Sequence, residues 1–561
     1  MAAFYVRLFY MQIIRHDFYK NKSQSQLEKF VALYPHRGKI YDRNNYPLAL
    51  TKVSYSLYAS PDKIEDKRKF VNLVAPIIDM PPLELGKKIQ ADTSFAWIKR
   101  KLESPVYEKL KKLKLSGLHF VQEERRVYPN EHLAAQILGF VGIDNQGLGG
   151  LEYRYDAALR GSRGQLVVEG DPRGVSLITN SVKTQPVLFE TPLNHGANIV
   201  TTLDHYIQYI AQKHLKKGVE EFGASSGSVI VMEPKTGEIL AMANMPEFDP
   251  NQWKQSAADA LKNRCVTDVF EPGSTFKLVT LAAAIEEGIV TPETVFNVPT
   301  KLVLHGATIK EAHDNGGKVT SGPRTVRDIM KESLNVGTSL VAQEMGQEML
   351  YKYIKKFRFG ERTHVEFPGE VGGISRAPKT WSGVDIAMIS FGQGIAVTPI
   401  QIANATAAIA NRGILMKPKL VRHLYNDQDA TVQGIGTKEI DRVISAATAE
   451  KVIDMMRDAV EKGTGSAAAI PGYAIAGKTG TAQKTREGGL GYDAGRYVAS
   501  FVGFLPIQNP RVVIFVVLHD PQRSIYGGVA AAPVFKNIAL DIIDYYSLPP
   551  TEDPARVDKP K

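Results

Sequence analysis

The 561-residue chain contains little cysteine, no long apolar run and only a modest excess of one charge sign. Its single cysteine, Cys265, excludes an intrachain disulfide, a zinc site built from cysteines and an iron–sulfur cluster. The 47 glycines and 31 prolines are too few for a collagenous or low-complexity chain. The 12 histidines form no H-E-x-x-H pair, so the sequence predicts no metal site.

The net charge of +10 is small for a chain of this length, and no nucleic-acid-binding motif accompanies it. We therefore predict no nucleic-acid partner and interpret the charge as the average of a solvated surface, with a polyanionic partner or surface left open. The length allows two to four domains.

The amino terminus is apolar and aromatic over residues 1–14, with a single charge at Arg7. A membrane-spanning helix needs about 20 such residues, so this run is too short to span a bilayer alone. No small-residue cleavage site follows, which argues against a removable signal peptide. Two interpretations stay open: an amphipathic helix packed on the protein, or the last turns of a membrane anchor whose beginning is missing from this chain. We favour the anchor.

Turn signals and hydrophobic patterns divide the chain into four segments. We expect an anchor remnant with its juxtamembrane segment at 1–30, a mixed α/β pedestal at 31–195, a larger domain at 196–548 and a disordered tail at 549–561. The pedestal contains no cluster of nucleophile, base and orienting group, so we predict a structural or partner-binding module there.

The larger domain has the pattern of an α+β fold. An amphipathic helix is expected at 204–222 and a final helix at 530–548, and strands are expected at 228–232, 239–245, 473–483, 497–505 and 511–518. A mostly helical insertion, residues 250–471, separates the strand groups. This order predicts an antiparallel sheet of about five strands flanked by helices.

The first motif with a chemical implication is Ser274-Thr275-Phe276-Lys277. Pro272 and Gly273 break the chain before it and an apolar run follows, which places Ser274 in the first turn of a buried helix, where free N–H groups favour negative charge. Lys277 lies one turn further on the same face. A desolvated lysine with a lowered pKa can activate a serine as nucleophile.

Two further motifs follow in order. Ser333-Leu334-Asn335 places a hydroxyl and a carboxamide in a polar break between helices, which suits proton relay and amide binding. Lys478-Thr479-Gly480-Thr481 follows an apolar run, and strand parity puts both threonines on one face, where an extended peptide could add to the strand. Glycine at 480 allows another backbone to approach closely.

The first and third motifs each have a decoy elsewhere in the chain, and we assign the decoys structural roles. Ser60-Pro61-Asp62-Lys63 has the pattern of a plain helix start, and Lys235-Thr236-Gly237 lies in a hairpin turn. Residues 223–227 match G-x-S-x-G, but a helix precedes them and a strand follows, the reverse of the context that a nucleophile elbow needs. Cys265 is interpreted as a small buried apolar side chain.

The three motifs together, in this order, resemble those of the class B penicillin-binding proteins, the monofunctional peptidoglycan D,D-transpeptidases. The resemblance covers nearly the whole chain and includes the segments R-G-K-I-Y-D-R at 37–43, G-G-L-E at 149–152, Y-D at 155–156, L-R-G at 159–161, E-P-G at 271–273, F-G-Q-G at 391–394, T-P at 398–399 and G-K-T-G-T at 477–481. The G-L-E element with D-P-R-G at 171–174 is more similar to the septal, cell-division branch. The middle residue Leu334 is less common in the family than a small or polar one.

The resemblance implies roles for eight residues and needs no cofactor. Ser274 would attack the D-Ala–D-Ala carbonyl of a stem peptide with Lys277 as base. Ser333, Asn335 and Lys478 would relay protons and hold the peptide. The substrate-binding residues expected on the strand are Thr479, Gly480 and Thr481, and the two threonines would bind the terminal carboxylate of the substrate or of a β-lactam. Backbone N–H groups of Ser274 and Thr481 would form the oxyanion hole.

The resemblance also implies partners and a location. The partners would be the lipid-linked precursor, the stem peptides, β-lactams and, through the pedestal, a membrane glycosyltransferase and division proteins. The protein would be a single-pass protein of the bacterial cytoplasmic membrane with an extracytoplasmic, periplasmic catalytic domain. Two alternatives stay open: a D,D-carboxypeptidase or β-lactamase on the same fold, and a non-catalytic penicillin sensor or division scaffold. The pedestal argues against the hydrolase, and the intact Ser274, Lys277 and Lys478 argue against an inactive scaffold.

Overall fold

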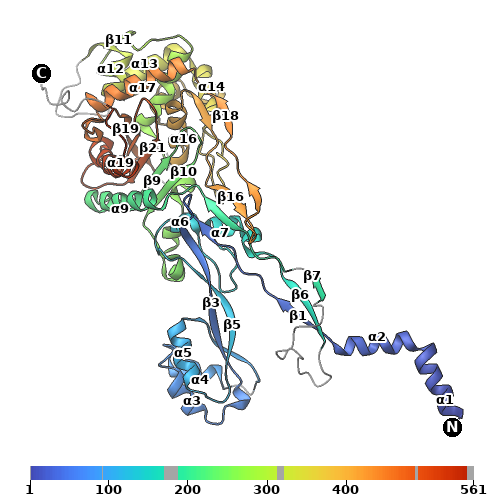
Figure 1. The fold of residues 1–561 in the computed structure, drawn as a ribbon. Helices are drawn as coiled ribbons and strands as arrows, with labels where there is room; N and C mark the ends of the chain where they lie inside the picture. Colours follow the sequence, from blue (N-terminus) through green and yellow to red (C-terminus); the bar gives the residue numbers. More distant parts are fainter. Residues whose placement is uncertain are drawn as a thin grey trace.

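The computed structural model describes residues 2–90, 93–169, 188–191, 193–311, 321–486 and 491–551. Two predicted features fall outside these ranges: the D-P-R-G element at 171–174 and residues 552–561 of the predicted tail. The described residues form an elongated molecule in which a pedestal rises from the amino-terminal helices to a larger catalytic-type domain (Figure 1).

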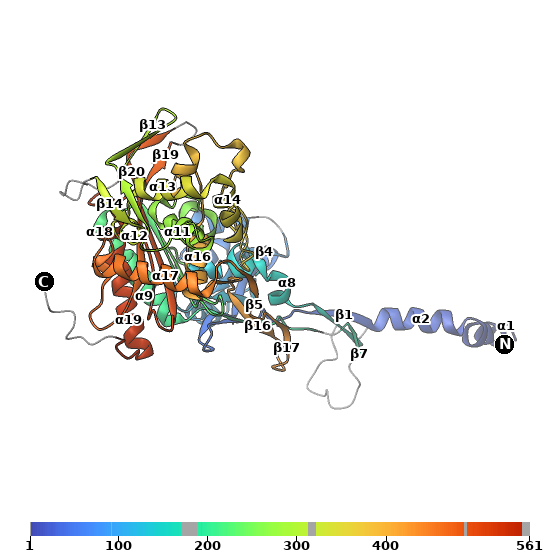
Figure 2. The same ribbon diagram turned by 90° about the horizontal axis from the view of Figure 1, so that it is seen from above.

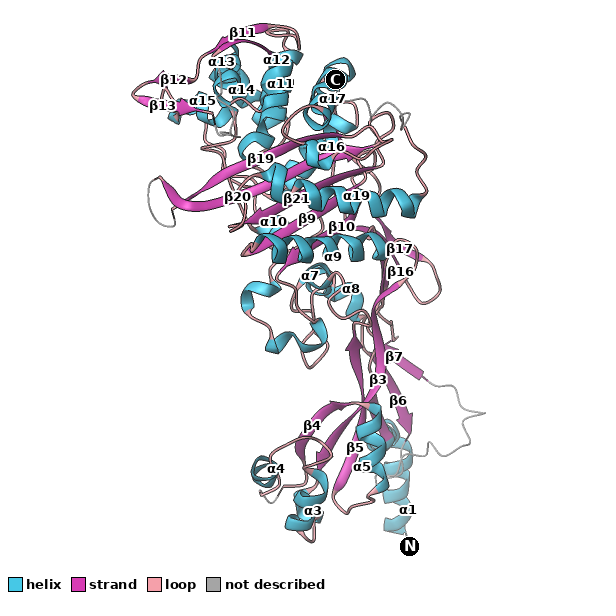
Figure 3. Cartoon of the chain, turned by 90° about the vertical axis from the view of Figure 1, so that its left-hand side faces the viewer, coloured by secondary structure: helices cyan, strands magenta, loops and turns pink. Residues whose placement is uncertain are grey.

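The larger domain is organised around a five-stranded antiparallel sheet, which confirms the predicted fold class. The order is β10–β9–β21–β20–β19, so β19, which carries Lys478, is an end strand (Figure 3). The strands are β9 (Ser226–Met232), β10 (Ile239–Met245), β19 (Ala476–Thr485), β20 (Tyr492–Leu505) and β21 (Val512–His519). The turn at 234–237 joins β9 to β10 as a hairpin, as predicted.

Both faces of this sheet are buried, which explains why its central strand is apolar throughout instead of alternating. Every residue of β21 is buried. Val512 and Ile514 face α9 (His205–Phe222) and α19 (Ala532–Tyr546), whereas Val513 and Phe515 belong to the core shared with the helical insertion. Successive side chains of a strand point to opposite faces, so a helix layer on each side requires an unbroken apolar run.

The insertion is only partly the helical segment that the sequence predicts. Its helices are α10 (Arg264–Thr267), α11 (Lys277–Glu286), α12 (Val326–Glu332), α13 (Asn335–Met345), α14 (Gln347–Lys356), α15 (Asp385–Ser390), α16 (Pro399–Ala410) and α17 (Ala446–Glu461). Short strands also occur: β11 (Val295–Val298) with β14 (Gly322–Thr325), β12 (Lys301–Leu304) with β13 (Ala307–Lys310), and β15 (Ile414–Met416) with β18 (Glu439–Arg442). These strands have only three or four residues, too few to show a clear two-residue period.

The pedestal is a mixed α/β module, as predicted. Its long hairpin-like pair is β3 (Pro47–Ala59) and β5 (Leu118–Val127), joined in register over ten residue pairs, and β4 (Ala96–Leu102) lies beside β3. A separate apolar core packs these strands against α3 (Lys67–Val74), α4 (Pro82–Lys88) and α5 (Ser104–Lys112). A second small sheet contains β1 (Glu28–Leu33), β6 (Gly164–Glu169) and β7 (Leu188–Thr191).

One mixed sheet connects the pedestal to the larger domain. Strand β2 (Ile40–Tyr41) pairs with β8 (Asn198–Thr201), which pairs with β16 (Val421–Tyr425), and β17 (Thr431–Gly434) follows. Beside it, α6 (Ala135–Leu138), α7 (Gly150–Arg154) and α8 (Asp156–Arg160) pack at the junction. The two parts therefore share backbone hydrogen bonds as well as apolar contacts.

A buried ionic cluster brings together pedestal segments that are far apart in the sequence. The guanidinium of Arg37 donates to Glu152 Oε2 at 2.8 Å and to Asp156 Oδ1 at 2.7 Å, and Arg126 Nε donates to Glu152 Oε1 at 2.6 Å. The side chains of Arg37, Arg126 and Glu152 are 3%, 1% and 0% exposed. These charged residues therefore have a structural role at the centre of the pedestal.

The amino-terminal helices project away from the rest of the protein (Figures 1 and 2). They are α1 (Ala2–Phe9), a π-helical turn (Tyr10–Ile14) and α2 (His16–Leu27). Phe4, Phe9 and Ile13 are among their exposed apolar side chains, so the interpretation of residues 1–14 as a helix packed on the protein is wrong for this structure. Within the described ranges, no single helix combines the length and apolar character needed to cross a membrane.

Candidate active site

The serine of the first motif lies in a tight turn that is held from two sides. Ser274 is 7% exposed and belongs to a 3₁₀ turn (Gly273–Phe276), and the α-helix α11 begins only at Lys277. Since the 3₁₀ turn continues directly into α11, Ser274 lies in the first turn of a buried helical segment, as the sequence predicts. Gly273 has φ +53°, and its N–H donates to the Gly392 carbonyl at 3.1 Å. This positive φ and close approach explain the glycine before the serine.

Lys277 extends from the start of α11 into a fully buried polar cluster. Its Nζ donates to Asn335 Oδ1 at 2.8 Å and to the Ser333 carbonyl at 2.5 Å, and it lies 3.4 Å from Ser333 Oγ. Burial lowers the pKa of Lys277 from 10.5 to about 7, while the carboxylate of Glu311 acts in the opposite direction. At neutral pH a large fraction of Lys277 is thus a free amine, as a general base requires.

Ser333 holds an unusual backbone conformation between two helices. It is the C-cap of α12, with φ +60° and ψ +41°, and α13 begins two residues later at Asn335. A non-glycine residue in this left-handed region is strained, and such strain is typical of functional sites. The conformation directs the Ser333 hydroxyl toward both lysines, which confirms the predicted polar break between helical segments.

Lys478 reaches the same hydroxyl from the end strand of the sheet. Its Nζ donates to Ser333 Oγ at 2.7 Å and to the Thr479 carbonyl at 3.1 Å, and its side chain is fully buried. Burial and the nearby Lys277 ammonium hold the pKa of Lys478 well below its usual range. Two buried lysines therefore meet at one hydroxyl, and like-charge repulsion favours a neutral form.

The three remaining motif residues on β19 occupy different surroundings. Thr479 Oγ1 lies 2.9 Å from Thr464 Oγ1, and Thr481 Oγ1 accepts a hydrogen bond from Gly527 N at 3.2 Å. At Gly480 a Cβ atom would lie 2.3 Å from Ser500 Oγ and 2.9 Å from Thr275 Cγ2. The close approach predicted for Gly480 is thus made by Ser500 and by the turn that carries the serine.

The Ser274 hydroxyl is not part of the hydrogen-bonded cluster. Among the residues that the structure describes, the side-chain partners of Lys277 are Ser333 and Asn335, and Ser274 Oγ is not one of them. The structure therefore brings together Lys277, Ser333, Asn335 and Lys478 and places Ser274 at the adjoining turn. Catalytic hydrogen bonds often shorten only when substrate is bound.

Two carboxylates lie near the cluster, and only Glu271, in the E-P-G segment, carries a sequence signal. Glu311 accepts hydrogen bonds from the backbone N–H groups of Asn335 and Val336, the latter at 2.9 Å, and so caps the amino terminus of α13. Glu271 accepts from Gly394 N at 2.8 Å, and burial raises the pKa of Glu271. Glu311 lies in a polar stretch after a short hairpin strand, where a lone carboxylate has no periodic or motif context.

The decoy residues have the structural roles that the sequence predicts. Ser60 precedes a short 3₁₀ turn, Pro61–Lys63, in the pedestal. Gly223 ends α9 in the left-handed conformation and Ser226 begins β9, so residues 223–227 form no nucleophile elbow. Cys265 is completely buried, and this burial raises the pKa of its thiol.

Two family models match this chain. Residues 227–540 match the penicillin binding protein transpeptidase domain, and residues 32–188 match the penicillin-binding protein dimerisation domain. The second match covers most of the pedestal, and the first covers the five-stranded sheet and its insertion.

Relatives of known name are similar over almost the full length. The chain is 34% identical to a probable peptidoglycan D,D-transpeptidase PenA of Neisseria gonorrhoeae, covering 98% of this chain and 91% of that protein. It is 30% identical to the peptidoglycan D,D-transpeptidase FtsI of Escherichia coli, covering 97% and 89%. A crystal structure of penicillin binding protein 3 from Mycobacterium tuberculosis, complexed with aztreonam, superposes with a TM-score of 0.73 and 31% identity, covering 93% of this chain and 98% of that one.

Proposed function

This chain belongs to the class B penicillin-binding proteins, which join a dimerisation domain to a transpeptidase domain, and we propose that Ser274 is its acylated nucleophile. The protein is a serine-type peptidoglycan D,D-transpeptidase and a target of β-lactams. The residue assignment rests on one observation: two buried lysines with lowered pKa values meet at the Ser333 hydroxyl. One of them, Lys277, lies one turn from Ser274.

In the first half-reaction Ser274 Oγ attacks the carbonyl carbon between the two terminal D-alanines of a stem peptide. The serine proton passes to the free amine of Lys277. The C–N bond breaks, and this proton is relayed from Lys277 through Ser333 and Lys478 to the departing amine of D-alanine. The products are an ester on Ser274 and free D-alanine.

In the second half-reaction an amine from a neighbouring stem peptide attacks the ester. A new C–N bond forms, the ester C–O bond breaks and a proton returns to Ser274. Asn335 binds the substrate amide, and Thr479 and Thr481 bind its terminal carboxylate in the first step. Because β19 is an end strand, the peptide can lie along it as an additional strand.

The turn around Ser274 also positions the charge-stabilising groups. Backbone N–H groups of Ser274 and Thr481 form the oxyanion hole, a contribution worth roughly 10²–10³ in rate for each donor. Gly480 keeps β19 close enough to the 3₁₀ turn for both donors to face one carbonyl oxygen. A β-lactam acylates Ser274 by the same attack and leaves a slowly hydrolysed ester.

We assign this activity to septal wall synthesis outside the cytoplasmic membrane. The support is the similarity to FtsI and PenA over the full chain and the exposed aromatic and apolar side chains of α1, which suit a membrane-proximal segment. A single-pass anchor would place the catalytic domain in the periplasm. The pedestal would bind a membrane glycosyltransferase and division proteins, and the wall precursors would be lipid-linked.

Labelling with a fluorescent penicillin tests the nucleophile. We expect Ser274→Ala to abolish labelling and Ser60→Ala, at the decoy motif, to label like the parent protein. Equal labelling of Ser274→Ala and the parent would exclude Ser274 as nucleophile.

Product analysis separates the transpeptidase from a hydrolase. With lipid-linked substrate and an active glycosyltransferase, we expect cross-linked dimers that disappear in Ser274→Ala. Release of D-alanine without dimers would favour a carboxypeptidase, and rapid turnover of the penicillin would favour a β-lactamase.

A further inference from the structure

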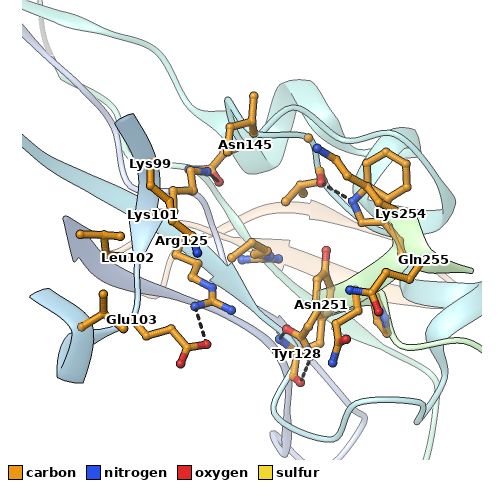
Figure 4. A pocket seen from close by; sticks show the side chains of 18 of the residues that line it. Lys99, Lys101, Leu102, Glu103, Arg125, Tyr128, Asn145, Asn251, Lys254 and Gln255 are labelled. Carbon is orange, nitrogen blue, oxygen red and sulfur yellow. Dashed lines mark hydrogen bonds and ion pairs between the residues drawn. The ribbon is translucent and has the colours of Figure 1, made fainter. Parts of the chain in front are cut away.

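A cavity of about 500 Å³ lies where the pedestal meets the larger domain, and none of the motif residues lines it (Figure 4). One wall comes from β4, β5 and the start of α5. The opposite wall is a 3₁₀ segment, Pro250–Gln255, which follows β10 in the larger domain. Asn251 and Tyr128 exchange backbone–amide hydrogen bonds at 3.1 and 3.0 Å, so the two walls are firmly joined.

The lining is strongly cationic, and its lysines have no acidic partner. Lys99 Nζ donates to the Ile78 carbonyl at 2.5 Å, Lys101 Nζ donates to Asn145 Oδ1 at 2.6 Å, and Lys254 Nζ lies 5.8 Å from the Trp253 ring centroid. Within the described part of the chain, none of the three lysines forms an ion pair. The carboxylates of Glu123, Glu124 and Asp144 act on Lys101 from a longer distance. None of them forms an ion pair with a cavity lysine in the described residues, so the positive charge without a direct counterion favours an anion in the cavity.

Lys101 and Arg126 show that this charge is held in place by the fold. Lys101 has φ +53°, a strained conformation, and burial lowers its pKa to about 8. Arg126 also lines the cavity, and its Nη2 is buried without a hydrogen-bond partner in the described residues. Arg126 Nε is already paired with Glu152 Oε1 at 2.6 Å, so Arg126 adds a fixed and paired cation to the wall of the cavity.

The lining also contains apolar side chains beside neutral polar ones, and these decide what kind of anion fits. Ile77, Leu102, Val106 and Ile143 contribute to it, whereas its carboxylates are Asp79 and Glu103, the latter paired with Arg125 at 3.3 Å. A bare inorganic phosphate would leave this apolar surface unused. A polypeptide with both carboxylates and apolar side chains would use both parts of the lining.

We propose that this cavity binds an acidic, partly apolar segment of a partner protein, held by Lys99, Lys101 and Lys254. A wall glycopeptide fits less well, because the indole that could stack on a sugar is already stacked on Phe140, with ring centroids 4.5 Å apart. This proposal gives a site and a ligand chemistry for the partner binding that the proposed function assigns to the pedestal. It rests on the proposed function only in assuming that a partner protein exists.

The first experiment measures binding with a fluorescein-labelled random copolymer of glutamate and tyrosine and the full chain. Fluorescence anisotropy gives Kd for the parent, for Lys101→Gln/Lys254→Gln and for the matched control Lys217→Gln/Lys451→Gln. The control lysines are exposed on α9 and α17, so both double variants lose the same net charge. We expect the cavity variant to weaken binding about tenfold or more and the control less than about twofold. Equal Kd values for the two variants would overturn the proposal.

The second experiment locates the bound polymer. Because Cys265 is buried, Gln255→Cys creates one accessible thiol at the cavity, and Lys217→Cys creates one elsewhere. An environment-sensitive dye on each thiol should respond to the copolymer only at position 255. A response only at position 217 would reject the cavity as the binding site. A change of the dye at position 255 with wall muropeptides but not with the copolymer would reject a polypeptide ligand.

Acylation by the fluorescent penicillin distinguishes failure of this inference from failure of the proposed function. All variants should label at the parent rate, which also shows that they fold. Lost copolymer binding with normal labelling supports the cavity assignment. If the parent protein itself does not label, the chemistry assigned to Ser274 is contradicted. The cavity proposal is then judged from the Kd values of the cavity variant and the matched control variant.

Discussion

The pH dependence of acylation should report the free amine of Lys277. Its pKa of about 7 means that about half of the molecules carry a neutral lysine at pH 7. A lysine with the ordinary value of 10.5 would be neutral in only about one molecule in 3000. Burial therefore raises the fraction of competent base by about three powers of ten.

The expected profile has a slope and a plateau. Below pH 7 the second-order rate of acylation should fall about tenfold per pH unit, since protonation of Lys277 removes the base. Above about pH 8 the rate should level off. Lys478 lies beside the same hydroxyl, so the observed inflection is a property of the lysine pair.

Glu311→Gln should move this inflection to lower pH. The Glu311 carboxylate raises the pKa of Lys277, so its neutral isostere removes a charge that favours the protonated form. Glutamine can still accept a hydrogen bond at the start of α13, which preserves part of the cap. Glu450→Gln, an exposed carboxylate on α17, is the control and should leave the profile unchanged.

The assay is stopped-flow acylation by a fluorescent penicillin between pH 5 and pH 9. A flat rate across pH 7 would refute Lys277 as a titrating base. An inflection that stays in place or rises in Glu311→Gln would refute the electrostatic link between this carboxylate and the lysine.

Three further substitutions test the packing around the site and the pedestal. Glu152→Gln removes the carboxylate shared by two buried arginines, leaving Arg126 without an ion-pair partner in the described residues and Arg37 with Asp156 alone; it should lower the free energy of unfolding by roughly 3–5 kcal/mol. Glu450→Gln, at a 3.9 Å surface pair, should change it by less than about 0.5 kcal/mol; chemical denaturation measures both. Gly480→Ala forces a Cβ atom against Ser500 and the turn that carries Ser274, which should lower the free energy of unfolding by roughly 1–3 kcal/mol and slow acylation. Gly436→Ala, with open space around it, should change neither quantity. Ser333→Gly should be more stable than Ser333→Ala by about 1 kcal/mol because glycine tolerates φ +60°, while both lose the hydroxyl that Lys478 contacts and acylate at least about tenfold more slowly; equal stability of the two would contradict the strain argument.

The sheet and the order of the motifs were predictable because they depend on local patterns. The apolar runs of β9, β10 and β21 and the turn at 234–237 identify strands without any tertiary information. The short strands of the insertion were not predictable, since three or four residues carry too little periodicity.

The candidate site was likewise predictable from the sequence only in part. Ser274 and Lys277 are linked by sequence spacing, and the other two motifs follow by resemblance to a family. The meeting of Lys277 and Lys478 at one hydroxyl depends on residues more than 140 positions apart. Glu311 was missed because its effect on α13 and on Lys277 exists only after the chain folds.

Three short motifs in order, through their resemblance to a known family, determined the reaction class of this protein from the sequence alone, whereas the single cysteine and the modest charge only excluded other classes. Tertiary structure decided the properties of the groups. Burial lowers the pKa values of Lys277 and Lys478, and the junction of two domains gathers three lysines without ion-pair partners in the described residues around a cavity. The physical reason is that residue type and local spacing are written in the chain, whereas desolvation and long-range charge depend on which distant segments pack together.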